Sequence, residues 1–341
     1  MKVRVLAANA AMTLSLLPAP SFVQLSLAQD QERPTATFRS SVDVVSVSAV
    51  VRDRKGRFVG NLKQQDFIVA ESGQPRPILD FHAQSDGPVK LALLFDISGS
   101  MRVGSKAVDA VQTARVLLSA LKAGDEAALF SFDTGLDRVT TFTSDVQSLI
   151  TALDHLNQPF GQTSIYDAVA ETAKTVAAQG AGHGRVPQRS AVVLLTDGID
   201  TRSRLTSEQV TTMASSIDIP VYVIAVMATI DDPRAGGTAH DDVAGPLPNL
   251  ARWTGGEMFT ASAPAHASVA ARQIVDELRH QYLLAFEASR GAGWKPVEVR
   301  ARDRGLTVRA RSGYAAGNNG LNNGTSESAS GTEQSAPLIG R

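Results

Sequence analysis

Five residues with oxygen-bearing side chains stand at spacings that suit a divalent cation. Asp96, Ser98 and Ser100 alternate within a short loop, and a glycine between the two serines permits a tight bend. Asp197 follows a second apolar run, and Thr163 stands in a loop between these two segments. Oxygen donors without imidazole or thiolate favour Mg²⁺, Mn²⁺ or Ca²⁺ over softer metals. The residue types therefore predict a site for a hard divalent cation, with Mg²⁺ expected first and Mn²⁺ or Ca²⁺ as alternatives.

The charge of this set matters as much as its geometry. Asp96 and Asp197 together only neutralise a divalent ion, and the three hydroxyl groups add no charge. A structural calcium cage would normally present more carboxylates. We therefore expect the bound ion to accept a further acidic ligand from outside the chain.

The loops that carry these residues are positioned by alternating strands and helices. Apolar runs at 90–95 and 190–195 are typical of strands that are covered on both faces. Residues 103–121 carry apolar side chains three and four positions apart, which predicts a helix. Similar patterns predict strands at 126–132 and 221–226 and helices at 145–156, 167–178, 206–216, 250–253 and 268–279.

This alternation predicts an α/β fold with a doubly wound, mostly parallel, Rossmann-like sheet. Ligands of such sheets bind outside the carboxyl ends of the strands. Asp96 and Asp197 directly follow two of these ends, so the pattern places the five residues at one edge.

Two regions rich in short strands flank the predicted domain, which we place at residues 88–282. Residues 29–87 comprise a polar linker and then short alternating strands, as in a small β-sandwich-like module. Residues 283–315 predict a C-terminal β extension. The tail at 316–341 is rich in Gly, Asn, Ser and Thr and is expected to be disordered.

The N-terminus predicts export. Lys2 and Arg4 precede a short apolar run, and small residues follow near Ala28, which is the pattern of a signal peptide at residues 1–28. A short anchor or a frayed helix is the alternative, but prolines interrupt the run before it reaches the length of a membrane span. We expect an exported protein, periplasmic or secreted, with no membrane span.

Composition excludes several classes of function. The 341 residues include 33 basic and 34 acidic side chains, so bulk charge gives no reason to expect nucleic acid or anionic membrane as a partner. Cysteine is absent, which excludes disulfides, thiolate metal sites and a cysteine nucleophile. The sequence makes no prediction of oligomeric state.

The motifs resemble a known family. Asp96-Ile-Ser-Gly-Ser100, Thr163 in a later loop and Thr196-Asp-Gly198 are similar, in order and in context, to the metal-ion-dependent adhesion site (MIDAS) of von Willebrand factor type A domains. The resemblance covers about residues 89–279. The segment Val50–Gly56 and the ending at Gly313-Tyr314 are similar to a subgroup of bacterial exported proteins with this domain.

The resemblance implies a role for each residue. Ser98 and Ser100 would bind the metal directly, Thr163 directly or through water, and Asp96 and Asp197 mainly through bound water and hydrogen bonds to the serines. A Glu or Asp of a protein partner would complete the octahedron. The family often carries glycine where this chain has Gln162, which bears on loop flexibility.

Each motif also has a simpler interpretation. Ser98 or Ser100 could cap a helix, and Thr-Asp-Gly is a turn signal. Asp200 is expected to cap the helix that follows it, and a position next to the metal ligands is the alternative. The acidic cluster from Asp231 to Asp242 is expected to be a solvated surface loop within 230–248. Two tryptophans are expected to pack, and four histidines show no ligand spacing: Trp253, Trp294, His155, His183, His266 and His280.

The leading functional hypothesis is a non-enzymatic adhesion or interaction module. A Mg²⁺-dependent phosphoryl-transfer hydrolase is the enzyme alternative, but Ser98 occupies the place where that chemistry needs a second carboxylate, and no lysine stands in an obvious phosphate-binding loop. A serine hydrolase would need a Gly-x-Ser-x-Gly elbow, which the segment around Ser98 lacks. A structural envelope component is the third class, and a chelatase-type subunit conflicts with the predicted signal peptide.

Overall fold

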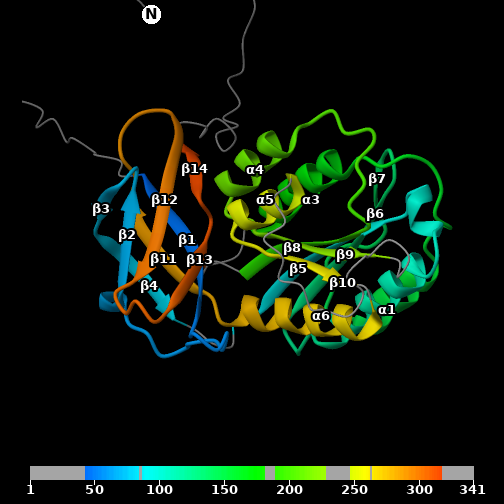
Figure 1. Cartoon of the computed structure of the whole chain (residues 1–341), viewed down its shortest axis with the longest axis horizontal. Coiled ribbons are helices and arrows are strands. Elements are labelled where there is room, and N and C mark those ends of the chain that lie inside the picture. Colours follow the sequence, from blue (N-terminus) through cyan, green and yellow to red (C-terminus); the bar gives the residue numbers. More distant parts are fainter. Residues whose placement is uncertain (1–42, 84–86, 181–188, 228–245, 262, 317–341) are drawn as a thin grey trace, which may run out of the picture. The chain divides into compact units, whose positions relative to one another are not determined.

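The structure, a computed structural model, describes residues 43–83, 87–180, 189–227, 246–261 and 263–316 (Figure 1). The predicted signal peptide, most of the predicted linker, almost all of the predicted tail and the acidic cluster at 231–242 lie outside these residues. None of the described helices is long and apolar enough to cross a membrane.

A six-stranded sheet forms the centre of the fold. Its strand order is β10-β9-β8-β5-β6-β7, and every neighbouring pair is parallel except β6 and β7. The strands are β5 (Val89–Asp96), β6 (Glu126–Phe132), β7 (Leu136–Arg138), β8 (Arg189–Thr196), β9 (Val221–Val226) and β10 (Met258–Ala261). This arrangement confirms the predicted α/β fold with a mostly parallel central sheet.

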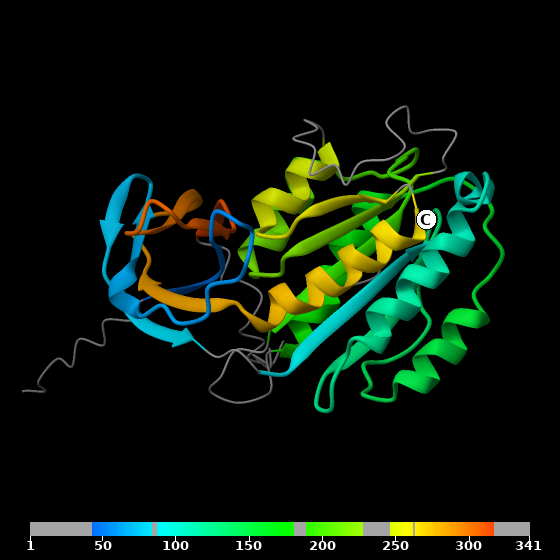
Figure 2. The same cartoon turned by 60° about the horizontal axis from the view of Figure 1, so that its bottom comes forward.

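Helices cover both faces of this sheet because its central strands are apolar on both sides. On one face Leu91, Leu93 and Phe95 pack with residues of α1, α2 and α6. On the other face Ala92 and Leu94 pack with residues of α3, α4 and α5. Figures 1 and 2 show α1 and α6 together on one side of the sheet. The helices are α1 (Lys106–Ser119), α2 (Val146–Asp154), α3 (Ile165–Gly180), α4 (Ser207–Ser216), α5 (Pro246–Thr254) and α6 (Pro264–Arg279), with short 3-10 turns η1 (Gln64–Asp66) and η2 (Gly99–Arg102).

Three of these elements, one helix and two short strands, differ from the prediction. Helix α5 begins at Pro246, so the loop expected over 230–248 ends earlier than predicted. A proline fits the first turn of a helix, where its missing N–H would have no partner. Strands β7 and β10 were not predicted, because their three and four residues are too few to show a pattern.

The flanking strands form two four-stranded sheets. One has the order β13-β1-β11-β4 and the other β14-β12-β2-β3. Their strands are β1 (Val44–Arg52), β2 (Phe67–Glu71), β3 (Gln74–Arg76), β4 (Ile78–Ala83), β11 (Tyr282–Glu287), β12 (Gly293–Ala301), β13 (Thr307–Ala310) and β14 (Gly313–Ala316). Residues from both sheets share one apolar core that includes Val47, Phe67 and Phe286. We call this unit the β-sandwich.

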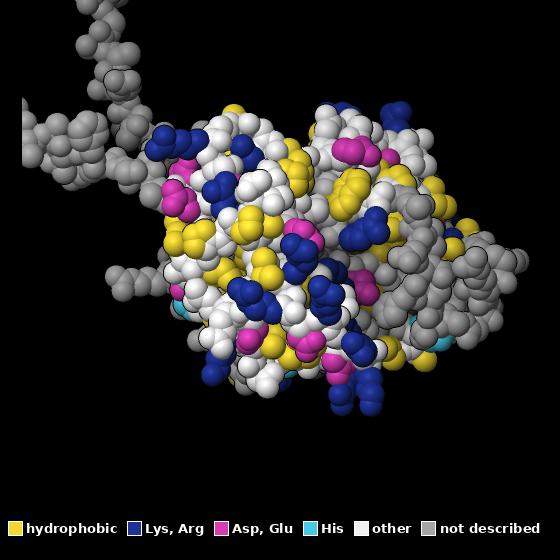
Figure 3. Space-filling model, turned by 60° about the vertical axis from the view of Figure 1, so that its left-hand side comes forward, with side chains coloured by type: hydrophobic (Ala, Val, Ile, Leu, Met, Phe, Trp, Pro, Cys, Tyr) yellow, Lys and Arg dark blue, Asp and Glu magenta, His cyan; other side chains and the backbone are white. Residues whose placement is uncertain are grey.

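The β-sandwich combines strands from before and after the central domain. β1 pairs with β11 and β13, and β2 pairs with β12, all antiparallel. The sequence patterns describe an N-terminal module and a C-terminal extension without relating them, but their strands lie in common sheets. Figure 3 shows one face on which Lys and Arg side chains are interspersed with Asp and Glu.

A group of buried ion pairs connects the β-sandwich with the central domain, and we call it the seam. Glu277 of α6 is inaccessible to solvent and binds both Arg52 of β1 and Arg309 of β13. Arg309 also binds Glu257, which precedes β10. Each seam carboxylate therefore has a guanidinium partner.

Candidate metal site

The two predicted carboxylates lie on neighbouring strands at one edge of the central sheet. Asp96 is the last residue of β5, and Asp197 directly follows β8. These strands are parallel and in register at Phe95 and Leu195, so both carboxylates emerge at the same carboxyl edge. Asp96 is 0% exposed and Asp197 is 7% exposed, so both lie beneath the surface.

The Asp96 carboxylate is held by two hydrogen bonds. Its Oδ1 accepts from the Ser98 backbone N–H at 2.8 Å, and its Oδ2 accepts from the Thr196 hydroxyl at 2.5 Å. Burial raises the pKa of Asp96 above its ordinary value and the nearby charge of Asp197 adds to this rise, while hydrogen bonds from Ser98 and Thr196 oppose it. The charged form of Asp96 is therefore under-compensated by the protein alone.

The two predicted serines lie together. The hydroxyl oxygens of Ser98 and Ser100 are 3.1 Å apart. Ser98 stands at the start of η2 but makes no side-chain capping hydrogen bond to it, which argues against the simpler cap interpretation. A pair of hydroxyl groups turned toward each other can present both oxygens to one ion.

The loop that carries Thr163 is fixed against the loop of the serines. The Gly99 N–H donates to the Gly161 carbonyl at 2.9 Å, and Gly161 has a φ of 88°, which suits glycine. A Cβ on Gly99 would come within 3.0 Å of that carbonyl, so the close approach needs glycine there. Thr163 is 2% exposed, and its backbone N–H donates to the Thr201 hydroxyl at 2.9 Å. Each of the two loops thus has a glycine at the point of contact, and Gly161 gives the Thr163 loop bending freedom although the next residue is Gln162.

Asp200 has a different role from the predicted one. Its Oδ1 accepts from the N–H of Ile165, the first residue of α3, at 2.7 Å. Helix α4 is instead capped by Thr206 in a capping box with Gln209. The prediction that Asp200 caps the following helix is therefore wrong, because a carboxylate can cap a helix that is distant in sequence when tertiary packing brings it there.

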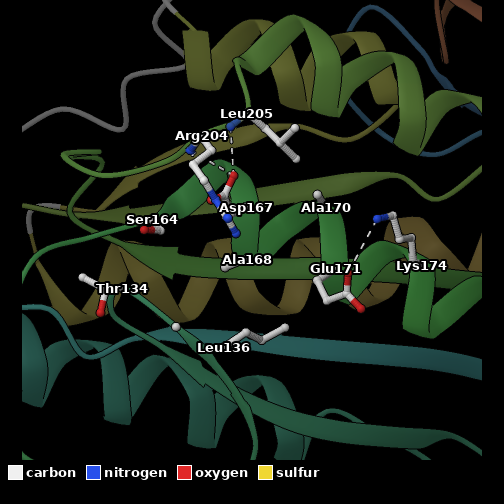
Figure 4. Close-up of a pocket in the computed structure, with 11 residues that line it drawn as sticks. Thr134, Leu136, Ser164, Asp167, Ala168, Ala170, Glu171, Lys174, Arg204 and Leu205 are labelled. Carbon is white, nitrogen blue, oxygen red and sulfur yellow. Dashed lines mark hydrogen bonds and ion pairs between the residues drawn. The ribbon is translucent and has the colours of Figure 1, made fainter. Parts of the chain in front are cut away.

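A hollow beside these loops shows how the segment after Asp197 is fixed (Figure 4). It has a volume of about 370 Å³, and its walls include Thr134, Ser164 and Lys174. Within it, Asp167 of α3 accepts from the backbone N–H groups of Arg204 at 3.1 Å and Leu205 at 2.9 Å. Arg204 and Leu205 belong to the connection between β8 and α4. The hydrogen bonds to Asp167 therefore hold this connection next to Thr163.

A lysine that the sequence analysis overlooked lies at the site. Lys106, the first residue of α1, places its Nζ 3.2 Å from Oδ2 of Asp197. Lys106 is only 5% exposed. No sequence pattern marks this lysine, because it has the spacing of an ordinary surface residue in the first turn of a helix.

The donor set fits a hard divalent cation. The oxygens come from two carboxylates and neighbouring hydroxyl groups, and one carboxylate is buried with an elevated pKa, which a cation would relieve. No group of three or more His, Cys, Asp or Glu side chains suited to a metal occurs among the described residues, so this site depends on hydroxyl groups beside its two carboxylates.

The remaining candidates do not join this site. His155 hydrogen-bonds the carbonyl of Thr151, and His280 that of Asp276. His183 lies outside the described residues. Trp294 is 41% exposed, and its ring covers Gly313, where a Cβ would lie 2.5 Å from it.

A mostly parallel sheet with helices on both faces and oxygen-bearing side chains at its carboxyl edge defines a Rossmann-like domain. Residues 91–199 match the family description "von Willebrand factor type A domain", so the chain contains a domain of this family, as the motifs predicted. No curated protein matches the chain.

Solved structures with a similar fold come from bacteria and from a mussel. The conserved hypothetical protein BatB from Bacteroides thetaiotaomicron is 17% identical over 56% of this chain and 98% of its own, with a TM-score of 0.45. A von Willebrand factor type A protein from Catenulispora acidiphila is 13% identical over 82% of this chain and 74% of its own, with a TM-score of 0.45. Proximal thread matrix protein 1 from the mussel byssus, with a zinc-occupied MIDAS motif, is 17% identical over 61% of this chain and 49% of its own, with a TM-score of 0.44.

Proposed function

We propose that this protein is an exported, non-enzymatic interaction module that captures a Glu or Asp side chain of a protein partner through a divalent cation. Asp96, Ser98, Ser100, Thr163 and Asp197 would hold the ion, with Mg²⁺ expected first and Mn²⁺ or Ca²⁺ as alternatives. The observation that carries the proposal is the convergence of two buried carboxylates and the paired hydroxyl groups of Ser98 and Ser100 at one sheet edge.

Lys106 strengthens the argument from charge. With Asp96 and Asp197 ionised and Lys106 protonated, the protein groups sum to −2 + 1 = −1, and a divalent ion brings the site to +1. Hydroxyl ligands cannot cancel this excess. An anionic ligand from another molecule would cancel it, and a carboxylate is the anion that proteins supply.

The geometry of Asp96 disfavours the hydrolase alternative. A phosphoryl-transfer nucleophile needs a free oxygen in line with the phosphorus atom. Both oxygens of Asp96 accept hydrogen bonds, from Ser98 and Thr196, and the side chain is 0% exposed. Lys106 does not restore this chemistry, since its ammonium group is engaged with Asp197.

The proposal is tested by metal titration and by capture of carboxylates. Purified protein is titrated with Mg²⁺, Mn²⁺ and Ca²⁺ by calorimetry, and its unfolding is followed in metal and in chelator. At a metal concentration 100 times its Kd we expect a stabilisation of about 2.7 kcal/mol. Asp96→Asn should abolish it, whereas Asp137→Asn, an exposed change on β7, should preserve it.

Carboxylate binding to the metal-loaded protein separates the functional classes. Binding of acetate to the loaded wild-type protein, lost in chelator and in Asp96→Asn, is the expected result. Metal stabilisation without any carboxylate binding would instead indicate a structural ion. Steady hydrolysis of a phosphate ester that Asp96→Asn abolishes would establish the enzyme.

A further inference from the structure

Large apolar side chains are exposed on all three loops that carry the proposed ligands. Val103 is 49% exposed, Phe160 75% and Ile199 50%. Val103 follows η2, Phe160 precedes Gly161, and Ile199 follows Asp197 by two positions. We call these three residues the apolar rim. Exposed apolar residues scattered singly need no explanation, but their recurrence around one site does.

Hydrogen bonds fix each rim residue to the site. The Phe160 N–H donates to the Ile97 carbonyl at 2.8 Å, between Asp96 and Ser98. The Ile199 N–H lies 3.4 Å from Oδ1 of Asp197, which accepts from it. The Val103 N–H donates to the Ser100 carbonyl at 3.2 Å. The apolar rim is therefore tied to the same backbone that positions the ligands.

The charge of the site and the apolar rim favour two different groups in one ligand. A site with a charge of +1 favours an anion at its centre, as argued above, while exposed apolar side chains are stabilised by covering them with apolar surface. A free small anion such as acetate satisfies only the first demand. A polypeptide segment satisfies both when a large apolar side chain stands next to its acidic residue.

We propose that the apolar rim selects partners in which the captured Asp or Glu is flanked by a large aliphatic or aromatic side chain. This inference rests on the proposed function, since the carboxylate must first reach the metal. The rim residues determine specificity and do not bind the ion. The partner's apolar side chain would pack on Phe160 and Ile199, and its carboxylate would complete the coordination of the metal.

The test compares two small carboxylates as probes. Mn²⁺-loaded protein is titrated with acetate and with 3-phenylpropionate, which adds an aromatic group to the same carboxylate. We expect the wild-type protein to bind 3-phenylpropionate about tenfold more tightly, because the phenyl ring leaves water on the rim.

Variants assign this preference to the rim. In the double variant Phe160→Ser, Ile199→Ser the ratio between the two probes should fall to below about threefold, with the affinity for Mn²⁺ unchanged. Both side chains are exposed, so the variant should fold, and unchanged metal affinity reports this directly. Leu79→Ser, a matched change at a side chain 53% exposed on β4, should keep the wild-type ratio.

The outcomes separate the two proposals. Equal affinity of wild-type protein for both probes would overturn the inference while leaving the proposed function intact. A preference that survives in the double variant would also overturn it. Metal binding without binding of either probe would contradict the proposed function itself. Rim-dependent binding to phosphatidylglycerol vesicles, with no preference between the probes, would assign the rim to a lipid surface and overturn the inference.

Discussion

Buried carboxylates at the seam and at the sheet edge differ in how completely the protein compensates their charge. At the seam, burial acts to raise the pKa of Glu277, but the guanidinium groups of Arg309 and Arg52 outweigh it and hold the pKa below its ordinary value. At the sheet edge, burial raises the pKa of Asp96, and the neighbouring charge of Asp197 raises it further. The same type of group is therefore satisfied in one region and left in need of a cation in the other.

The β-sandwich repeats the pattern of the seam. Glu71 is 0% exposed, and its carboxylate accepts hydrogen bonds from Tyr314 and Arg76, each at 2.5 Å, and from the Ser289 N–H at 3.1 Å. Burial acts to raise its pKa, yet these hydrogen bonds lower it. Compensated charges of this kind serve the fold, whereas the under-compensated carboxylate of Asp96 is the type of group that a binding site often contains.

The largest expected effect on stability comes from removing a guanidinium group at the seam. Arg309→Met leaves two buried or half-buried carboxylates, Glu277 and Glu257, without one of their partners. Breaking a buried pair in this way costs about 3–5 kcal/mol of unfolding free energy. Urea unfolding in chelator measures it.

Arg300→Met is the matched control for this change. Arg300 pairs with Glu298 at 3.3 Å, and both side chains are more than half exposed. Its loss should cost less than about 1 kcal/mol. Equal losses for the two variants would contradict the distinction between a compensated seam and an ordinary surface.

At the sheet edge, removing a positive charge is expected to have a smaller and favourable effect, on metal affinity. Lys106→Met removes a positive charge that pairs with Asp197 and would repel the metal ion. The affinity for Mn²⁺ should rise about tenfold, which corresponds to about 1.4 kcal/mol. Calorimetry measures the change, with Lys174→Met as a control, since the pair of Lys174 with Glu171 is exposed. Weaker metal binding in Lys106→Met would mean that the lysine supports the site instead of competing with the ion.

The smallest effects are expected in the pH dependence of stability, measured in chelator between pH 7 and pH 4. Because the folded pKa of Glu71 lies below its ordinary value of 4.5, its contribution is present above 4.5 and is lost as the pH falls through the folded value. The pKa of Asp96 is raised above 3.8, so its contribution is present below 3.8 and is lost as the pH rises through the folded value.

Two variants separate the opposite pH dependences that Glu71 and Asp96 give to folding stability. Asp96→Asn should stabilise the metal-free protein by about 1 kcal/mol or less at pH 7 and have a smaller effect at pH 4. Glu71→Gln should reduce the loss of stability on acidification. If Asp96→Asn destabilises the metal-free protein at pH 7 as much as Glu71→Gln does, the protein compensates both carboxylates equally and the proposed difference between the two regions is wrong.

The sequence predicted the central sheet and the placement of the two carboxylates well. Apolar runs such as Leu91–Phe95 indicate strands that are buried on both faces, and neighbouring parallel strands bring Asp96 and Asp197 to a common edge. Among the residues that the structure describes, each of the six helices was predicted from the sequence, with its ends shifted by a few residues. These features depend on local pattern and on general rules of winding, which a single sequence contains.

What the sequence did not predict depends on contacts between distant residues. Alternation indicates that β1 and β11 are strands, but it does not specify that Val44 pairs with Glu287. Asp200 reaches Ile165 only through packing of the loop after β8 on α3. Lys106 has the spacing of any helical surface residue, and only the fold turns it toward Asp197.

The pairing of β1 with β11 and β13 has a consequence for the order in which the chain folds. As the chain is synthesised from its N-terminus, β1 is available long before its partners, and the whole central domain lies between them. Contacts so distant in sequence close slowly unless the intervening segment is already compact. We therefore expect the sheet around β5 to form first and to bring Val89 and Arg279 to positions from which the outer strands can join. Completion of the β-sandwich then depends on correct folding of the domain inserted within it.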